Sequence, residues 1–254
     1  MPRVVVITGA TSGIGRQAAL AFASAGEVVV GTGRDQARLS ELAPHVDLAL
    51  TLDHCDPQSV RAATAAILGR YGRVDVLVLN AGQGHFVAAL EDSVKDMQRV
   101  MDANLWGPVR VTQALLPSMK ERGGVILAIS SVAGLRGYPR HGAYCASKHA
   151  LNGWFGALRT ELLGSGVQVG ILCPPAVDTP FFENAGYDDF KADHPGLKLM
   201  SPQEVAQHIV DASEHPPALA VLGTRAKVLE GVNRVAPGVL EWARRKSGKI
   251  GGAQ

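Results

Sequence analysis

Tyr144 and Lys148 are the two side chains of this sequence best suited to acid–base chemistry. They lie four residues apart, so on a helix both side chains leave the same face. A phenol titrates near pH ~10, and a fixed ammonium beside it favours the phenolate and lowers that pKa. A decrease of roughly 3 pKa units corresponds to about 4 kcal/mol. The pair therefore predicts an acid that works near neutral pH, although an exposed helix would show the same spacing by chance.

A glycine-rich loop upstream of this pair favours the chemical interpretation. The loop follows the apolar run Val4–Ile7 and precedes a helical stretch. Glycines let the backbone approach a pyrophosphate, and the free N–H groups and dipole of a helix N-terminus attract it. An ordinary glycine turn is the alternative, but the strand–loop–helix order favours dinucleotide binding. The candidate cofactor-binding residues in this loop are Thr8, Gly9, Thr11, Ser12, Gly13, Ile14 and Gly15.

The elements that position these residues alternate along the chain. Short apolar runs without polar alternation predict strands buried on both faces, at Val4–Ile7, Val28–Val30, Leu48–Leu52, Val74–Leu79, Val125–Ile129 and Val167–Leu172. Helical stretches separate them, at Gly15–Ala25, Asp35–Leu42, Ser59–Arg70, Lys95–Met119 and Tyr144–Leu163, with a further helix start at Ser201–Glu204. This order predicts one α/β domain over residues 1–254, a Rossmann-type doubly wound parallel sheet with helices on both faces.

Composition limits the classes of function. The chain has 254 residues and a net charge of +2, which gives no reason to expect nucleic acid as a partner. Three cysteines and no secretory signal predict a reduced, cytoplasmic protein. No apolar run approaches the length of a membrane span. The eight histidines show no pair at ligand spacing, so we expect no metal site.

The ordered set of motifs resembles the short-chain dehydrogenase/reductase family over roughly residues 3 to 215. The loop matches that family's Thr-Gly-x-x-x-Gly-x-Gly pattern, and Ser131 lies thirteen positions before Tyr144, as the family serine does. Pro174–Thr179 is similar to its Pro-Gly-x-Val-x-Thr loop, with Pro175 in place of the glycine. The resemblance implies further cofactor contacts at Asp53, Asn80, Ala81, Gly82, Tyr144, Lys148, Pro174, Val177 and Thr179.

The resemblance and the chemistry assign the same catalytic roles. Carbonyl reduction requires a hydride donor and a proton donor. Tyr144 is the predicted proton donor, and the resemblance implies that Lys148 also holds the nicotinamide ribose. Ser131 is expected to hydrogen-bond the substrate oxygen, with Ser130 as its rival. The resemblance implies that Asn104 binds a water that relays protons from Lys148, and a kink or cap in its helix is the alternative.

These roles predict an NAD(P)-dependent oxidoreductase acting on a carbonyl or secondary alcohol. A non-catalytic redox sensor or scaffold that binds the cofactor is the alternative. The resemblance implies a homodimer or homotetramer, formed through the helix after Asn104 and the helix that carries Tyr144.

The end of the second predicted strand bears on the choice of cofactor. A carboxylate there binds the ribose hydroxyl of NAD, whereas an arginine suits the phosphate of NADP. Gly33 occupies the expected carboxylate position and Arg34 follows it. This pattern favours NADP(H), and Asp35 keeps NAD(H) open.

The variable segment 181–200 is the predicted substrate flap. Its aromatic residues and others upstream predict a pocket for a bulky apolar ketone, or alternatively plugs in the core. The candidate pocket residues are His85, Phe86, Ser131, Tyr138, Phe181, Phe182 and Tyr187.

The tail 225–247 is basic and amphipathic, with a candidate apolar face at Val228, Leu229, Val232 and Val235. It resembles the tails of hydroxysteroid-type and retinoid-type members of the family. The tail is interpreted as a lid or a weak peripheral lipid contact, or else as a helix packed on the domain.

Overall fold

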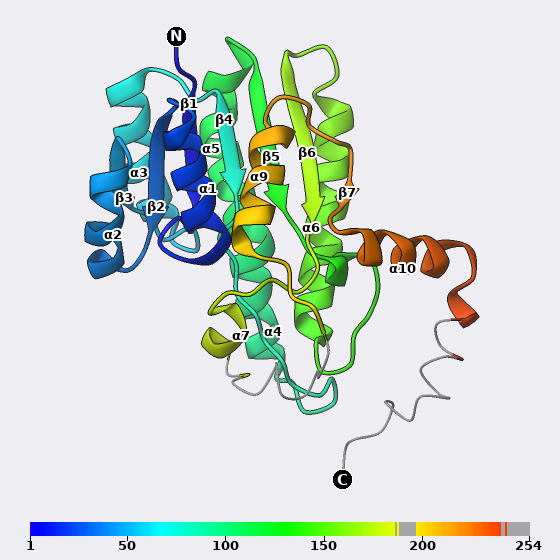
Figure 1. The fold of residues 1–254 in the computed structure, drawn as a ribbon. Helices are drawn as coiled ribbons and strands as arrows, with labels where there is room; N and C mark the ends of the chain where they lie inside the picture. Colours follow the sequence, from blue (N-terminus) through cyan, green and yellow to red (C-terminus); the bar gives the residue numbers. More distant parts are fainter. Residues whose placement is uncertain (186, 188–196, 240–241, 243–254) are drawn as a thin grey trace.

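The computed structural model describes residues 1–185, 187, 197–239 and 242. Its core is a parallel sheet with the strand order β3-β2-β1-β4-β5-β6-β7 (Figure 1). The strands are β1 (Val4–Thr8), β2 (Val28–Gly33), β3 (Leu48–Thr51), β4 (Val76–Leu79), β5 (Gly124–Ile129), β6 (Val167–Cys173) and β7 (Ala220–Val221). The predicted single α/β domain with a doubly wound sheet is confirmed.

Helices cover both faces of the sheet. On one face α3 (Pro57–Tyr71), α5 (Gly107–Lys120) and α6 (Gly142–Glu161) pack in one apolar cluster. On the other face α1 (Gly13–Ser24), α2 (Gln36–Leu42) and α9 (Pro202–Ala212) pack in a second cluster. Successive residues of β1 alternate between the clusters, which explains why the strand is apolar throughout.

The crossovers on either side of β1 run in opposite directions, because β2 lies to one side of β1 and β4 to the other. Ligands of such sheets bind in the crevice outside the carboxyl ends of the strands at this point. The glycine loop leaves β1 there and enters α1. The fold therefore brings the loop to the expected binding crevice.

The predicted helix Lys95–Met119 is wrong in one respect. The helical stretch consists of α4 (Val94–Met101), a π-helical segment over Asp102–Trp106, and α5. The Gly107 N–H donates to the Asp102 carbonyl, five residues back. Pro108 has no N–H, so it cannot close the α-helical bond to the Asn104 carbonyl. The sequence Gly107-Pro108 was the signal for this irregularity.

The other predicted elements lie within three residues of the observed ones. Strand β7 was not predicted, because two residues are too few for a period to be read. The expected helix start at Ser201 is confirmed, since Ser201 and Glu204 form a reciprocal capping box.

Parts of the flap and the tail lie outside the described residues, namely 186, 188–196, 240–241 and 243–247. The described flap includes α7 (Phe181–Asn184), and the described tail forms α10 (Thr224–Val235). No helix of the described part is long and apolar enough to cross a membrane.

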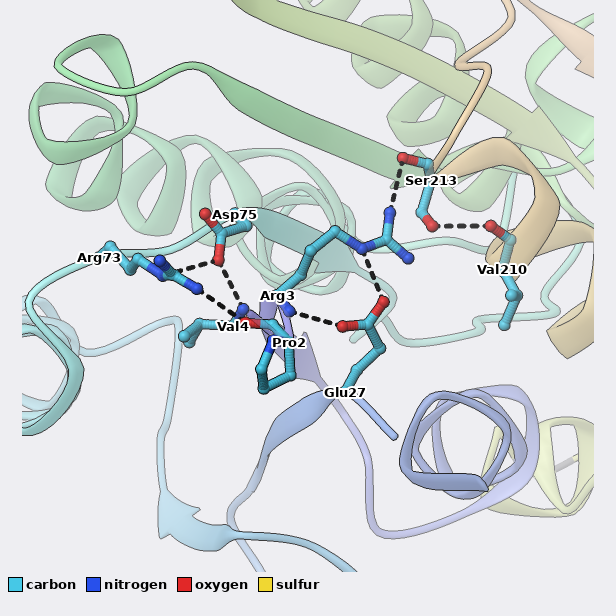
Figure 2. A network of polar contacts seen from close by, with 8 residues as sticks. All are labelled: Pro2, Arg3, Val4, Glu27, Arg73, Asp75, Val210 and Ser213. Atoms are coloured by element: carbon cyan, nitrogen blue, oxygen red, sulfur yellow. Dashed lines mark hydrogen bonds and ion pairs between the residues drawn. The ribbon is translucent and has the colours of Figure 1, made fainter. Parts of the chain in front are cut away.

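The amino end of the sheet carries a network of charged side chains (Figure 2). Arg3 Nε lies 2.8 Å from Glu27 Oε1, and its backbone N–H donates to Glu27 Oε2 at 2.6 Å. Arg73 Nε lies 3.0 Å from Asp75 Oδ2, which also accepts from the Val4 N–H at 2.6 Å. These pairs join β1 to the segments that lead into β2 and β4.

Candidate active site

One cleft of about 1640 Å³ runs along the carboxyl ends of the strands. It is larger than a typical pocket for one drug-sized ligand, so it can hold a dinucleotide and a substrate together. Of the predicted cofactor-binding residues, its walls include Thr8, Gly9, Thr11, Ser12, Gly13, Ile14, Arg34, Asn80, Ala81, Gly82, Tyr144, Lys148, Pro174, Val177 and Thr179. Gly15 and Asp53 are not among the lining residues.

The glycine loop is fixed to the end of β4. The Thr8 hydroxyl accepts from the N–H groups of Asn80 and Ala81 at 3.0 and 3.1 Å, and the Asn80 amide donates back to the carbonyls of Thr8 and Gly9. A Cβ on Gly15 would lie 2.2 Å from the Gly9 carbonyl oxygen. Gly15 therefore permits the tight turn of the loop.

The predicted catalytic residues Tyr144 and Lys148 both lie on α6. Tyr144 and Lys148 are 9% and 5% exposed, and the Lys148 ammonium is 5.8 Å from the centre of the Tyr144 ring. Lys148 Nζ donates to the Ile129 carbonyl at the end of β5, at 2.9 Å. Both functional groups thus face the cleft from one face of the helix.

Burial shifts the pKa of both groups. It lowers the pKa of Lys148 to about 8, with a small opposing effect of the nearby Cys173 thiol. Burial also raises the pKa of Tyr144, and a hydrogen bond with Ser131 opposes that increase. The expectation that Lys148 lowers the pKa of Tyr144 is therefore wrong for the protein alone, because desolvation of the phenolate outweighs the opposing hydrogen bond with Ser131.

Ser131 is better placed than Ser130 to contact a substrate. The Ser131 hydroxyl accepts from the Ala133 N–H at 3.1 Å, lines the cleft and hydrogen-bonds Tyr144. The Ser130 hydroxyl faces the Cys173 thiol and lowers its pKa, whereas burial raises that pKa to about 11. Ser131 and Tyr144 together present two hydroxyl groups to one point in the cleft.

Asn104 connects the loop after β4 to α6. Its Oδ1 accepts from the Gln83 N–H at 2.7 Å, and its Nδ2 donates to the Gln83 carbonyl at 2.9 Å and to Ser147 Oγ at 3.0 Å. Ser147 Oγ in turn donates to the Tyr144 carbonyl at 2.8 Å. Asn104 is fully buried and does not line the cleft. Gln83 and Ser147 were missed by the sequence analysis, because nothing in their spacing marks them.

The end of β2 holds cations and has no room for a carboxylate at Gly33. A Cβ on Gly33 would lie 2.5 Å from Thr11 Cγ2. Asp35 caps α2 by accepting from the Arg38 N–H at 3.1 Å, and its other oxygen lies 3.6 Å from Arg38 Nε. Within the described residues no carboxylate pairs with Arg34, which lines the cleft. Arg38 also lines the cleft and was not predicted.

Asp53 is turned inward beside the cleft. Its carboxylate accepts from the Cys55 N–H at 3.0 Å, and its own N–H donates to Ser59 Oγ at 2.9 Å. Leu52, His54 and Cys55 line the cleft instead. Burial lowers the pKa of His54 to about 4, so this ring is neutral at pH 7.

An aromatic cluster lines the substrate side of the cleft. Phe86 stacks on Phe182 with 5.5 Å between ring centres, and meets Phe181 and Tyr144 edge-on at 6.1 Å. Of the predicted pocket residues, Tyr187 alone is not among the lining residues, and it packs against Phe86 at 5.7 Å. The structure thus brings the predicted pocket residues together.

A charged pair also lines the cleft. Arg136 Nε lies 2.9 Å from Glu230 Oε1 of α10, and donates to the Tyr138 hydroxyl at 2.9 Å. The side chains of Arg136 and Glu230 are 14% and 9% exposed, and both line the cleft. Sequence reasoning missed this pair, since the two residues lie ninety-four positions apart.

One cluster of the described residues has metal-ligand types, at His85, Asp92 and Asp96. His85 Nε2 lies 2.9 Å from Asp92 Oδ1, and Asp96 accepts from the Ser93 hydroxyl at 2.7 Å and pairs with Arg99. Each potential ligand is thus already bound to a protein group.

The chain as a whole is similar to known proteins. A model of the short chain dehydrogenase family matches residues 3–189. Mouse (Mus musculus) dehydrogenase/reductase SDR family member 7B is 40% identical over 225 residues, which cover 82% of this chain and 69% of that protein. The chain belongs to the short-chain dehydrogenase/reductase family.

Two of the solved structures that this chain resembles contain nicotinamide cofactors. An alcohol dehydrogenase from the archaeon Thermococcus sibiricus, complexed with 5-hydroxy-NADP, is 30% identical with a TM-score of 0.78, covering 87% of this chain and 96% of that one. A 3-ketoacyl-(acyl-carrier-protein) reductase from Brucella melitensis, complexed with NADH, is 30% identical with a TM-score of 0.79, covering 86% and 95%. Structural relatives thus bind either nicotinamide dinucleotide.

Proposed function

We propose that this protein transfers a hydride between a nicotinamide cofactor and a carbonyl or secondary alcohol, with Tyr144 as the general acid and base. The observation that carries the proposal is the shared cleft. The buried Tyr144 phenol, the Ser131 hydroxyl and the Lys148 ammonium face the same cavity as the glycine loop. The family membership and the dinucleotide-bound relatives support it.

The chain's own residues divide the work at the site. When bound, the nicotinamide cofactor supplies or accepts the hydride. The glycine loop, Asn80 and the segment Pro174–Thr179 would hold the dinucleotide along the strand ends. Tyr144 exchanges the proton at the substrate oxygen, and Ser131 donates a hydrogen bond to the same oxygen. Lys148 provides a positive charge beside both groups.

NADP(H) is the proposed preferred cofactor. Arg34 lines the cleft without a carboxylate partner among the described residues, and Asp35 is occupied by Arg38. A guanidinium in this state suits a phosphate dianion, whereas the ribose of NAD(H) would meet no carboxylate at Gly33.

The proposed substrate is a bulky apolar ketone or the corresponding alcohol. Phe86, Phe181 and Phe182 offer aromatic surface next to Tyr144. Arg136, a basic side chain that lines the same cleft, is already paired with Glu230. The pocket therefore suits an uncharged body rather than an anionic one.

We further propose a cytoplasmic homodimer or homotetramer that pairs through α5 and α6. All three cysteines are free thiols, which suits a reducing compartment. Phe155 of α6 is buried in the core, whereas Trp154 is partly buried and could contribute to the contact.

The test is an absorbance assay with NADPH and NADH in parallel against a panel of bulky ketones. We expect turnover with NADPH, and a loss of about 10²- to 10⁴-fold in Tyr144→Phe with cofactor binding retained. Tyr71→Phe is the matched control, because the Tyr71 hydroxyl has no hydrogen-bond partner among the described residues. Unchanged turnover in Tyr144→Phe would refute the catalytic role. Cofactor binding without turnover across the panel would favour the sensor alternative.

A further inference from the structure

Helix α10 has an inner face and an outer face with different neighbours. Ala226, Leu229 and Glu230 line the cleft together with Arg225 at its border, and Glu230 is paired with Arg136. Val228 and Val235 lie on the outer face and are 60% and 82% exposed. The helix projects from the edge of the sheet beyond β7 (Figure 1). One helix thus borders the substrate pocket and presents a separate surface to the surroundings.

The outer face is cationic. Arg225, Lys227 and Arg234 are exposed, and the single acidic residue of α10, Glu230, is buried against Arg136. Since no exposed residue within Thr224–Val235 is acidic, these three charges are not balanced on the helix itself. A surface of this kind attracts anions.

The exposed valines lie between these cations. Val228 and Val235 are seven residues apart, so both side chains leave the same side of the helix, with Lys227 and Arg234 beside them. Transfer of a valine side chain from water to an apolar environment is favourable in free energy. Lys and Arg side chains can extend their charged ends toward phosphates at a lipid surface. An anionic bilayer satisfies both requirements at once.

We propose that the outer face of α10, formed by Lys227, Val228, Arg234 and Val235 with Arg225 at its border with the cleft, docks on the surface of an anionic phospholipid bilayer. Docking would bring the mouth of the cleft, which α10 borders, to the membrane surface. The delivery of an apolar ketone from the bilayer to Tyr144 rests on the proposed function, but the docking itself does not.

A second copy of the chain fits this face less well. In a two-fold interface the same face meets itself, so the three cations would lie opposite three cations. Two valines offer little apolar area to offset that repulsion, because stable interfaces bury about 1,200 Å² or more. The charge of the helix therefore favours lipid over protein.

The test is co-sedimentation of the full chain with vesicles. We expect binding to mixed phosphatidylcholine–phosphatidylserine vesicles, little binding to phosphatidylcholine alone, and weaker binding as the salt concentration increases. Lys227→Gln with Arg234→Gln should weaken binding to the mixed vesicles about 25-fold, since each basic residue near such a surface contributes about fivefold. Arg61→Gln with Arg122→Gln removes the same charge at exposed positions elsewhere, and should leave most of the binding intact.

Two further measurements separate the outcomes. Neither Lys227 nor Arg234 lines the cleft, so turnover of a water-soluble ketone should be unchanged in the α10 variant. Vesicle binding that does not depend on phosphatidylserine would overturn the proposal. An equal decrease in vesicle binding for the Arg61→Gln with Arg122→Gln control would overturn it as well. A dimer in analytical ultracentrifugation that Val228→Ser with Val235→Ser converts to monomer would also overturn it, because a second copy would then cover this face.

Discussion

At one end of the parallel sheet the arginines of a network are paired with carboxylates, whereas at the other end two cations beside the cleft are not. At the amino end each arginine meets a carboxylate, with Arg3 Nε 2.8 Å from Glu27 and Arg73 Nε 3.0 Å from Asp75 (Figure 2). At the carboxyl end Lys148 meets a backbone carbonyl, and among the described residues no carboxylate pairs with it or with Arg34. Nothing in the strands themselves requires this difference.

Charges that stabilise the fold are paired, whereas charges that can contact a ligand are left without a carboxylate partner. A buried charge without a counter-ion is costly, so a chain under pressure only for stability would pair or replace it. The carboxyl end retains one such cation, the buried Lys148. The exposed Arg34 lines the same cleft and also has no carboxylate partner among the described residues. The balanced network holds strands together, and the unbalanced cations are available to a bound anion or a reacting group.

The largest expected effect follows from removing the buried charge in Lys148→Met. Turnover should fall by about 10²-fold or more, because the site loses its ammonium. Burial lowers the pKa of Lys148 from 10.5 to about 8, a penalty of about 3 kcal/mol at pH 7. After the lost hydrogen bond to Ile129 is subtracted, the variant should be more stable by about 2 kcal/mol at pH 7 in urea unfolding.

The pH dependence has a definite sign. Between pH 8 and 9.5 the unfolded wild type binds more protons than the folded protein at this site, so wild-type stability increases with pH. The difference in the free energy of unfolding between Lys148→Met and the wild type should therefore decrease over that pH range. Lys120→Met, at an exposed position, should leave the free energy of unfolding unchanged at both pH 8 and pH 9.5. A variant less stable than wild type at pH 7 would contradict an unbalanced charge at Lys148.

The next effect concerns Arg34. Arg34→Ala should reduce kcat/KM for NADPH about 10- to 100-fold, the contribution of a charge-assisted hydrogen bond, and leave the value for NADH nearly unchanged. Arg38→Ala should have a smaller effect, since Asp35 already partly neutralises Arg38. Steady-state kinetics gives kcat/KM for each cofactor. An equal decrease in kcat/KM for NADPH and NADH in Arg34→Ala would contradict a phosphate-binding role.

The smallest effect is expected at the amino end. Glu27→Gln should destabilise the protein by about 1 kcal/mol, because it weakens the contacts to both the side chain and the backbone of Arg3. Turnover should not change. Glu121→Gln, at an exposed position, is the control for stability. A large loss of turnover in Glu27→Gln would contradict the view that the amino-end network affects only stability, because it would show that the two ends of the sheet are coupled.

The sequence predicted the sheet and the main site because both rest on local patterns. Apolar runs of strand length revealed the strands, and the loop Thr8–Gly15 and the pair Tyr144 and Lys148 are recognisable from spacing alone. Parallel strands then bring these segments to one edge of the sheet, so their convergence needs no further information.

The remaining features depend on contacts between distant parts of the chain. Arg136 meets Glu230, and Asn104 meets Gln83 and Ser147, and no period in the sequence relates these residues. The direction of the Tyr144 pKa was mispredicted for a similar reason. The charge of Lys148 is visible in the sequence, but the extent of burial is set by Phe86 and Phe181, which pack on the phenol ring.

The π-helical segment Asp102–Trp106 has a consequence for comparing this chain with others. A π turn contains one residue more than an α turn, so a chain that lacked one residue here would still form a continuous helix from α4 into α5. The helix after the deletion would be rotated by about 100° relative to the helix before it, and Asn104 could not keep both Gln83 and Ser147. A one-residue gap at this point in an alignment would therefore mark a relative that keeps the fold but loses the hydrogen bonds linking Asn104 to Gln83 and Ser147. Such a relative could still match this chain at Asn104, Ser131, Tyr144 and Lys148.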